Sequence, residues 1–565
     1  MMNEKIIPIG YEDLKEFIDR NLYYIDKTAM LRDFLDNHSK VTLFTRPRRF
    51  GKTLNQSMFR RFFEDERTAD GTPVDNRYLF DDLAISSCGE KYLRHQQQYP
   101  VINLSLKSGK QPSYEMAYQS LLDEIIREFQ RHSYILNGEM ASRDRKIFVD
   151  ILNEKAQDIQ YAKALGLLSV CLEKYHGRKC IILIDEYDVP LENAWFRGFY
   201  DKMIGFIRSL FESALKTNDS LEFGMITGCL RISRESIFTG LNNLEINSVT
   251  GPEYGDAFGF TEAEIRKMLS YYKLEDKFSE LKDWYDGYLF GKNEIYNPWS
   301  IINYVKIAVA DPAAFPKAYW SNTSSNSIVR EIIENADQEM RDEVEQLMTG
   351  GTLEKPIHEE ITYADIHESS DNLWNFLYFT GYLTSAGQRY DGEKTYAKMV
   401  IPNTEIRTIY RDTILRWFDK SLEQKDLRPL IKAIEEGNCD EIGDIISDEL
   451  MDTISFFDYG ENYYQGFLTG LLKAGGGYLV QSNRESGYGR PDLVMKTRRI
   501  RNGKAVILEL KVAGSFEAME EKCMEALAQI EEKKYAESLQ REGYRDILRY
   551  GICFFKKECM VLKGD

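Results

Sequence analysis

The feature that most constrains the fold is a set of short apolar runs separated by segments with helical spacing. Residues 180–184 read Cys-Ile-Ile-Leu-Ile, and residues 40–44 and 100–106 are similar runs rich in β-branched residues. A strand without a polar face is typical of a parallel sheet covered on both faces. We expect a further strand at 221–227 and helices near 113–130, 159–176 and 196–217. This alternation predicts a doubly wound α/β core.

The remainder of the chain divides into two more regions. Residues 256–424 have mostly helical patterns with aromatic-rich segments, and we expect a helical lid or linking region there, with a winged-helix unit as one option. Residues 425–475 read as helical. Strands are then expected at 478–481, 491–495, 505–510 and 549–555, with a helix at 517–540. The predicted domains are therefore 1–255, 256–424 and 425–565, the last a second α/β unit.

Composition limits the compartment and the partners. No apolar run approaches the roughly 18–20 residues that span a bilayer, and the N-terminus lacks the pattern of a secretory signal. The eight cysteines form no C-x-x-C pair, so a reducing cytoplasm is expected, without membrane attachment. The net charge of −18 argues against a protein that coats nucleic acid. Two stretches are nevertheless basic, 46–63 and 481–511, and suggest two anion-handling sites.

A phosphate-binding loop is the first candidate site. Gly51-Lys52-Thr53 lies between a predicted strand and a predicted helix. In that context backbone N–H groups cradle phosphates, Lys52 would reach the β and γ oxygens, and the Thr53 hydroxyl would hold Mg²⁺. The general pattern has an earlier glycine, which is Arg46 here, so the match is incomplete.

An acidic strand end supplies the partner of that loop. The apolar run 181–184 is followed by Asp185 and Glu186. Asp185 would bind Mg²⁺ through water, and Glu186 would polarise the water that attacks the γ-phosphate of ATP. A strand that simply ends in acidic surface residues is the alternative. Loop and strand together predict a nucleotide site.

These segments resemble the prokaryotic AAA-ATPase-like P-loop proteins. The resemblance rests on Tyr24-Ile25-Asp26-Lys27-Thr28, Arg46-Pro47-Arg48-Arg49-Phe50-Gly51-Lys52-Thr53, Asp185-Glu186-Tyr187-Asp188 and Thr227-Gly228, and continues through Tyr285-Asp286-Gly287-Tyr288. It places Arg46 within the family's loop pattern and implies that Arg48, Arg49 and Phe50 belong to the nucleotide site. It further implies that Thr227 senses the γ-phosphate. Arg231 or Arg234 would contact that phosphate, in cis or as a finger in a neighbouring subunit of a homo-oligomer.

Two carboxylates and a lysine form the second candidate site. Asp492 begins one predicted strand and Glu509 lies near the end of the next, so an antiparallel pair would bring them together. Two carboxylates make an oxygen site suited to Mg²⁺ or Mn²⁺. Lys511 leaves the same strand face as Glu509 and would orient the attacking water. We expect the basic loop 496–504 to hold the phosphodiester backbone while the metal activates water.

This second set resembles the PD-(D/E)XK nuclease superfamily, which implies a restriction-endonuclease-like domain at 425–565. The resemblance adds Glu461, on the preceding helix, to the metal ligands. It also assigns supporting roles to Gln529 and Tyr535 on the following helix, although their spacing is longer than the family's. The pattern is short, and a degenerate fold that only binds or scaffolds is the alternative.

Three functions remain open from sequence. The leading one is an ATP-binding and ATP-hydrolysing protein whose nucleotide state gates an Mg²⁺-dependent nuclease, with DNA favoured over RNA as substrate. The second is a nucleotide-dependent signalling switch with a non-catalytic nuclease-like domain. The third is a DNA-handling ATPase of a mobile element, with a winged-helix unit in the middle region.

Overall fold

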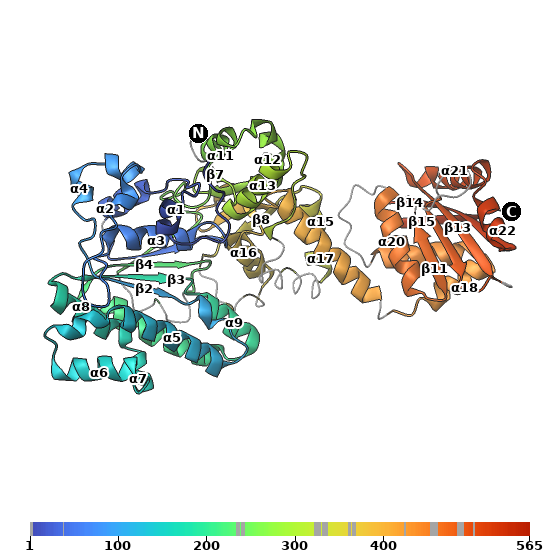
Figure 1. Cartoon of the computed structure of the whole chain (residues 1–565). Helices are drawn as coiled ribbons and strands as arrows, with labels where there is room; N and C mark the ends of the chain where they lie inside the picture. The colour runs from blue at the N-terminus through green and yellow to red at the C-terminus, as the bar shows by residue number, and fades with distance from the viewer. Residues whose placement is uncertain are drawn as a thin grey trace. The chain divides into compact units, whose positions relative to one another are not determined.

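The structure is a computed structural model of the whole chain (Figure 1). It describes residues 4–37, 39–232, 238, 243–320, 329, 337–359, 363, 366, 369–422, 425–451, 461–482, 491–500 and 503–564. The chain forms two compact units. Unit 1 comprises residues 1–322 and 353–406, and unit 2 comprises residues 323–352 and 407–565. No helix in the described part of the chain is long and apolar enough to cross a membrane.

A five-stranded parallel sheet forms the centre of unit 1. Its strands are β1 (Val41–Thr45), β2 (Val101–Ser105), β3 (Cys180–Asp185), β4 (Leu221–Gly228) and β5 (Leu244–Asn247). They lie in the order β2-β3-β4-β1-β5, with every pair parallel. β1 and β3 are buried along their whole length, as expected of strands covered on both faces. The predicted doubly wound α/β core is therefore present.

Helices cover both faces of this sheet (Figure 1). The helices of this part of unit 1 are α1 (Leu14–Asp19), α2 (Ala29–Asn37), α3 (Lys52–Phe63), α4 (Glu90–Leu93), α5 (Tyr114–Arg131), α6 (Ser142–Leu152), α7 (Asp158–Tyr161), α8 (Ala164–His176), α9 (Val189–Arg197) and α10 (Tyr200–Phe211). The helix predicted at 196–217 is present as α10 and the helical turn 212–216 that continues it, but it begins at Tyr200, and α9 before it was not predicted. Gly198 ends α9 in the left-handed conformation, at φ 78°, which only glycine adopts without strain.

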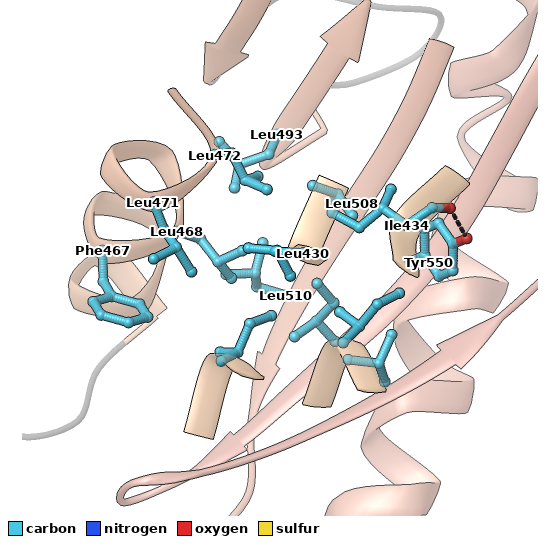
Figure 2. Close-up of a cluster of buried hydrophobic side chains, with 14 of the residues drawn as sticks. Leu430, Ile434, Phe467, Leu468, Leu471, Leu472, Leu493, Leu508, Leu510 and Tyr550 are labelled. Carbon is cyan, nitrogen blue, oxygen red and sulfur yellow. Dashed lines mark hydrogen bonds between the residues drawn. The ribbon is translucent and has the colours of Figure 1, made fainter. Parts of the chain in front are cut away.

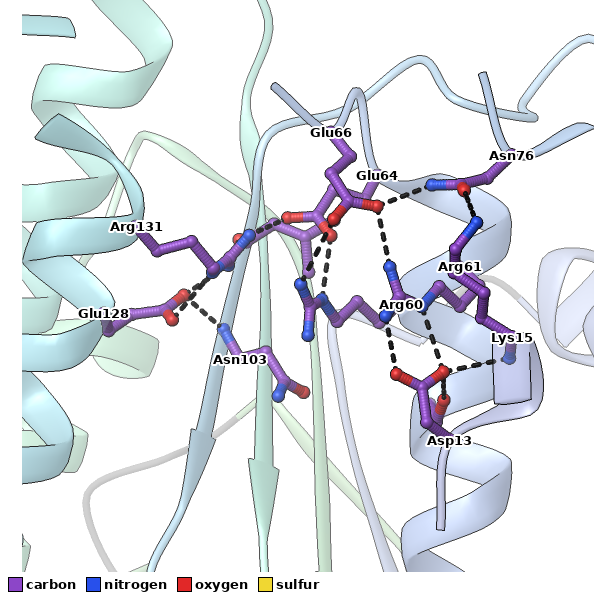
Figure 3. A network of polar contacts seen from close by, with 12 residues as sticks. Asp13, Lys15, Arg60, Arg61, Glu64, Glu66, Asn76, Asn103, Glu128 and Arg131 are labelled. Carbon is purple, nitrogen blue, oxygen red and sulfur yellow. Dashed lines mark hydrogen bonds and ion pairs between the residues drawn. The ribbon is translucent and has the colours of Figure 1, made fainter. Parts of the chain in front are cut away.

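A buried network of charges joins the helices at one end of the sheet (Figure 3). Arg131 on α5 pairs with Glu64 and Glu128, and Glu128 accepts a bond of 2.7 Å from the backbone N–H of Asn103 in β2. Arg61 on α3 pairs with Asp13 at 2.5 Å. The pKa of Glu128 is low although burial opposes this, because Arg131 and His132 stabilise the carboxylate.

The same network shows that part of the basic stretch 46–63 is neutralised by ion pairs within the protein. Arg60 pairs with Glu64 at 2.8 Å, and Arg61 pairs with Glu66 at 2.7 Å as well as with Asp13 (Figure 3). These two arginines therefore fix α3 to its surroundings and are not part of an open anion-binding surface.

The middle of unit 1 is less helical than predicted. Its helices are α11 (Glu262–Tyr271), α12 (Phe278–Tyr285), α13 (Pro298–Ala310) and α16 (Ser370–Thr380), and its strands are β6 (Tyr288–Phe290), β7 (Asn293–Ile295), β8 (Leu353–Pro356), β9 (Thr384–Tyr390) and β10 (Thr395–Val400). β6 and β7 form a hairpin, and the others form an antiparallel sheet in the order β8-β10-β9. Helix α17 (Thr404–Leu422) begins in unit 1 and continues into unit 2.

Unit 2 is a second α/β fold, as predicted. Its helices are α15 (Gln338–Met348), α18 (Arg428–Glu436), α19 (Cys439–Met451), α20 (Glu461–Ala474), α21 (Met519–Glu532) and α22 (Tyr535–Glu542). Its strands are β11 (Tyr478–Ser482), β12 (Leu493–Thr497), β13 (Lys504–Val512), β14 (Asp546–Phe555) and β15 (Glu558–Lys563). They lie in this order, with β13 and β14 parallel and the other pairs antiparallel.

Alternate residues of β13 face two different cores. Leu508 and Leu510 pack with Leu468 and Leu471 of α20, and the Tyr550 hydroxyl donates 2.6 Å to the carbonyl of Ile434 (Figure 2). Ala505 and Ile507 pack on the opposite face, with residues of α21 and α22. Since side chains alternate along a strand, Glu509 and Lys511 belong to the face covered by α21 and α22.

Candidate nucleotide and nuclease sites

The loop between β1 and α3 has the geometry of a phosphate cradle. Gly51 occupies the left-handed region at φ 85° and precedes the first residue of α3. A Cβ at Gly51 would meet nothing within 4 Å, so the backbone conformation and not space requires glycine. Lys52 is buried, and its Nζ donates to the carbonyls of Arg46 and Pro47 at 2.8 and 2.9 Å. The lysine thus lies across the inside of the loop.

Asp185 joins the loop to the neighbouring strands. Its Oδ2 accepts 2.7 Å from the hydroxyl of Thr53, and its Oδ1 accepts from the hydroxyl of Thr227 at the end of β4. Burial, followed by the nearby Glu186, raises the pKa of Asp185, while the bonds from Thr227 and Thr53 oppose the rise. The structure therefore brings Thr53, Asp185 and Thr227 together, as the motifs predicted.

Glu186 has a backbone conformation that is rare for its residue type. Its φ is 51°, in the left-handed region, which costs a non-glycine residue roughly 1 kcal/mol or more. Its backbone N–H donates 3.3 Å to the Thr227 hydroxyl, and the side chain is half-buried. The role predicted for Glu186 remains a prediction.

The side chains that follow Arg46 in the loop mostly contact protein. Arg48 pairs with Glu192 of α9, which outweighs burial and raises the pKa of the guanidinium. The guanidinium of Arg49 lies 3.9 Å from the ring centroid of Trp299. Phe50 is fully buried. Of the residues predicted from the loop motif, Gly51, Lys52 and Thr53 line the cradle, whereas Phe50 is an anchor in the core.

Of the two arginines predicted to contact the γ-phosphate, the structure describes only Arg231. Arg231 is half-buried and lies three residues after β4, at the same sheet edge as Thr227. Arg234 lies outside the described residues. The roles predicted for both remain predictions.

Asp188, to which the sequence assigned no site role, orders the segment that contains Arg231. Its Oδ2 accepts from the backbone N–H groups of Cys229 and Leu230, at 2.7 and 3.2 Å. The adjacent Tyr187 hydroxyl accepts 3.0 Å from the N–H of Ile232. The motif Asp185-Glu186-Tyr187-Asp188 carried the signal, but sequence alone could not show which backbone these side chains would hold.

Lys107 was also missed. It begins the short 3₁₀ turn Lys107–Gly109 after β2, and its Nζ lies 3.1 Å from Glu12. Ser105 of β2 pairs with Asp185 of β3, and the N–H of Leu106 donates 3.0 Å to the Asp185 carbonyl. This register places Lys107 at the sheet edge where Asp185 and Glu186 lie. Burial lowers the pKa of Lys107, but the hydrogen bond and charge of Glu12, followed by the charges of Glu186 and Asp185, raise it overall.

The loop residues fit a bound nucleotide with Mg²⁺. A buried lysine, a glycine-started helix without a side-chain cap, and a threonine–aspartate pair are the groups that hold phosphates and their metal. Lys52 now satisfies its donors with loop carbonyls, so it would exchange these bonds for phosphate oxygens.

In unit 2 the structure brings Asp492 and Glu509 together. β12 and β13 are antiparallel, with Leu493 opposite Leu508, so Asp492 and Glu509 are the next facing pair. The N–H of Asp492 donates 3.3 Å to Glu509 Oε2, and Asp492 Oδ2 accepts 2.8 Å from the N–H of Leu510. Lys511 Nζ lies 3.9 Å from Glu509 Oε1. The predicted cluster of two carboxylates and a lysine is therefore present.

Two glutamines and a tyrosine support this cluster. The side-chain amide of Gln529, on α21, donates to Glu509 Oε1. Tyr535 hydrogen-bonds Gln529, and burial raises the pKa of its phenol. Gln465, on α20, donates 2.8 Å to the carbonyl of Asp492. The structure thus places Gln529 beside Glu509, as the resemblance implied, and adds Gln465. The single helix expected at 517–540 is wrong, because it is divided into α21 and α22, and Tyr535 is the first residue of α22. The Glu461 side chain lies outside the described residues, so its role remains a prediction.

The basic loop lies at the other end of β12 from the carboxylates. β12 runs from Leu493 to Thr497 and separates Asp492 from the turn, a distance of roughly 17 Å at about 3.3 Å per residue. Lys496 is buried and pairs with Glu542 at 2.8 Å. Arg498 and Arg499 are exposed at the far end of the hairpin. They can contact a substrate only at a distance from the carboxylates.

The carboxylates of Asp492 and Glu509 are suited to an open Mg²⁺ site, in which the protein supplies only some of the ligands. No group of three or more His, Cys, Asp or Glu side chains suited to a metal occurs within the described ranges. Asp492 and Glu509 supply two carboxylates, and Mg²⁺ characteristically takes one or two carboxylates, with water and substrate phosphate completing its shell.

The fold and sites define a P-loop ATPase-type unit and a nuclease-type unit in one chain. Residues 8–238 match the model of a family described as predicted AAA-ATPase, and residues 459–564 match that of the PD-(D/E)XK nuclease superfamily. The chain carries both domains, which confirms both resemblances. It is also similar to an uncharacterized protein in the vnfD 5′ region of Azotobacter chroococcum mcd 1. The two are 24% identical over 422 residues, which cover 73% of this chain and 70% of the relative.

Proposed function

We propose that the chain binds and hydrolyses ATP, and that the bound nucleotide controls phosphodiester cleavage by the C-terminal domain. The observation that supports the first part is the Thr53–Asp185–Thr227 bond network beside the buried Lys52. The observation that supports the second is the facing pair of Asp492 and Glu509 with Lys511. The protein would work in the cytoplasm of a prokaryote.

At the first site, the protein's own groups divide the work. Lys52 and the first turn of α3 would hold the β and γ phosphates. Thr53, and Asp185 through water, would hold Mg²⁺, which would supply charge neutralisation of those phosphates. Glu186 accepts a hydrogen bond from the attacking water and orients it. Thr227 fixes the direction of Asp185 and the backbone of Glu186, so it couples phosphate contact to the acidic pair.

At the second site, Asp492 and Glu509 hold the divalent metal, which activates water when it is bound. Gln529 and the N–H of Leu510 fix the directions of the two carboxylates. Lys511 donates to the scissile phosphate or to the attacking water. We favour DNA over RNA as the substrate. Arg498 and Arg499, beyond a strand of roughly 17 Å, would contact backbone phosphates away from the scissile bond.

We also propose that β8, α16, β10 and β9 form a winged-helix-like unit that has a packing role. The strand order β8-β10-β9 with a helix before the hairpin supports this topology. In α16 all seven residues from Leu373 to Phe379 are buried, so this helix lacks a free face for reading a DNA groove.

The full chain, incubated with Mg²⁺ and labelled duplex DNA, single-stranded DNA or RNA, with and without ATP, tests the proposal. We expect cleavage of DNA at a rate that ATP changes. Asp492→Asn should abolish cleavage and leave ATP hydrolysis intact. Cleavage equal in wild type and Asp492→Asn at matched purity would refute the nuclease assignment and favour the switch. A wild type that does not bind ATP would refute the first part.

A further inference from the structure

The phosphate loop is attached to the middle of unit 1 by side chains that do not line the cradle. Arg46 is fully buried, its Nη1 donates 2.8 Å to the carbonyl of Asn247, and its guanidinium lies 5.0 and 5.3 Å from the rings of Phe258 and Phe290. Burial lowers its pKa to about 9. The residue that replaces the first glycine of the general pattern is thus a docking residue.

Two more loop residues make contacts of the same kind. The ring of Phe50 lies 4.9 Å from that of Tyr288 in β6, and its carbonyl accepts 3.1 Å from the N–H of Gly259. Gly381, the left-handed cap of α16, approaches Pro47 so closely that a Cβ there would lie 2.9 Å from the proline ring. The loop is therefore held in place from outside the sheet.

The contact between Arg49 and Trp299 connects the loop to helix α17 through neighbouring residues. Arg49 stacks on Trp299, which lies in the first turn of α13. The next residue, Ser300, donates 2.7 Å to Glu405 Oε2, and the N–H of Trp320 donates 2.8 Å to Glu405 Oε1. Glu405 is the second residue of α17 and is 1% exposed. A chain of direct contacts thus runs from the loop to the start of α17.

We propose that Trp299 and Ser300 are positioning residues that join the phosphate loop to α17, so that nucleotide in the cradle changes the stability of the first turns of this helix. The proposal rests on the nucleotide site proposed above. It identifies α17 as the helix that would respond to whether nucleotide is bound there. Helix α17 is suited to this because residues 404–406 belong to unit 1 and residues from 407 onward belong to unit 2. Two packed arrangements of one rigid element are the usual physical basis of such coupling.

The test measures two quantities in the full chain, ATP affinity by calorimetry and amide hydrogen exchange of residues 404–414 with and without Mg²⁺–ATP. In wild type, ATP should slow exchange in this segment. Ser300→Ala should keep ATP affinity within about twofold and lose at least half of that slowing. Trp299→Leu should lose the slowing and bind ATP about two- to fivefold more weakly, the range for a lost exposed cation–π contact.

Matched variants separate positioning from general damage. Trp299→Phe retains an aromatic face for Arg49 and should restore both quantities. Trp284→Leu removes another half-buried tryptophan of unit 1 and should change neither. Wild-type protein that binds ATP without altered exchange at 404–414 overturns this inference alone, as does full slowing in Ser300→Ala. Wild-type protein that does not bind ATP overturns the nucleotide site itself.

Discussion

Glu405→Gln should make unit 1 more stable at pH 8 and should not do so at pH 4.5. Burial raises the pKa of Glu405 to about 7, although bonds from the Trp320 N–H and the Ser300 hydroxyl oppose the rise. The folded state therefore keeps the proton to a higher pH than the unfolded chain does, whose carboxyl has the ordinary value of 4.5. The contribution of Glu405 to stability is therefore largest below pH 4.5, falls between pH 4.5 and 7, and stays at the lower level above that.

The size of the stability change follows from the difference between the folded and unfolded pKa values of Glu405. At about 1.4 kcal/mol per pH unit, a pKa of about 7 in place of 4.5 costs the folded state about 3 kcal/mol at pH 8. Glutamine removes this cost. It also places an NH₂ group where Glu405 accepted bonds, which loses roughly 1 kcal/mol. We therefore expect a net gain of about 2 kcal/mol at pH 8, and a loss of about 1 kcal/mol at pH 4.5.

Urea unfolding followed by tryptophan fluorescence is the appropriate assay. Five of the six tryptophans lie in unit 1, so the signal reports this unit (Trp195, Trp284, Trp299, Trp320 and Trp374). Glu354→Gln, at an exposed glutamate of β8, is the control and should show no such change between the two pH values. If the difference between Glu405→Gln and wild type is the same at pH 4.5 and pH 8, Glu405 titrates normally and the reasoning fails.

Four further predictions concern the two sites. Lys52→Ala should weaken ATP binding roughly 10- to 150-fold by calorimetry, since a charge-assisted bond is lost, and unchanged affinity would exclude the lysine from the cradle. Glu186→Gln should bind ATP but hydrolyse it far more slowly in a phosphate-release assay; equal turnover would remove its catalytic role. Lys511→Ala should reduce cleavage yet retain Mn²⁺ binding by calorimetry, because a charged lysine is no ligand, and full activity would contradict this. Replacing Arg498 and Arg499 by Gln should lower the slope of log K against log salt by roughly two on duplex DNA, and an unchanged slope would show that they contact no phosphate.

Sequence predicted the parts of the sites that depend on local chain order. A strand, a short loop and a helix placed Lys52 and Thr53, and the antiparallel pair of strands placed Asp492 opposite Glu509. Register fixes these positions, because a strand slipped by one residue would turn every side chain to the other face. The same reasoning predicted that Lys511 shares the face of Glu509.

The sequence also contains a local hairpin signal in the middle region that the predictions above did not use. Asp391 and Gly392 lie in the turn between β9 and β10, where Asp391 Oδ1 accepts from the N–H of Lys394 at 2.8 Å and Gly392 has φ 105°. An Asp-Gly pair between two strand-like runs is a strong hairpin signal. Reading it would have shown that the middle region contains a sheet as well as helices.

The contacts of Arg46 and Arg49 could not be predicted in this way. Asn247 follows Arg46 by 201 residues, and Trp299 lies 250 residues beyond Arg49 along the chain. Such contacts depend on how separate elements pack, and neither hydrophobic period nor turn chemistry encodes a partner at that separation. For this reason the sequence did not show that the guanidinium of Arg49, which the resemblance places in the nucleotide site, lies on the indole ring of Trp299.

The division of the chain between the two units affects how the protein can be cut. The polypeptide passes from one unit to the other three times, after residues 322, 352 and 406. The segment 323–352 contributes to unit 2, where Glu345 of α15 lies 3.7 Å from Lys557. Proteolysis at one of these three connections therefore leaves the two units covalently linked by the others, provided that the segments of each unit stay associated. Recombination at a single point would likewise not exchange one unit intact, because each unit contains segments from both sides of a crossing.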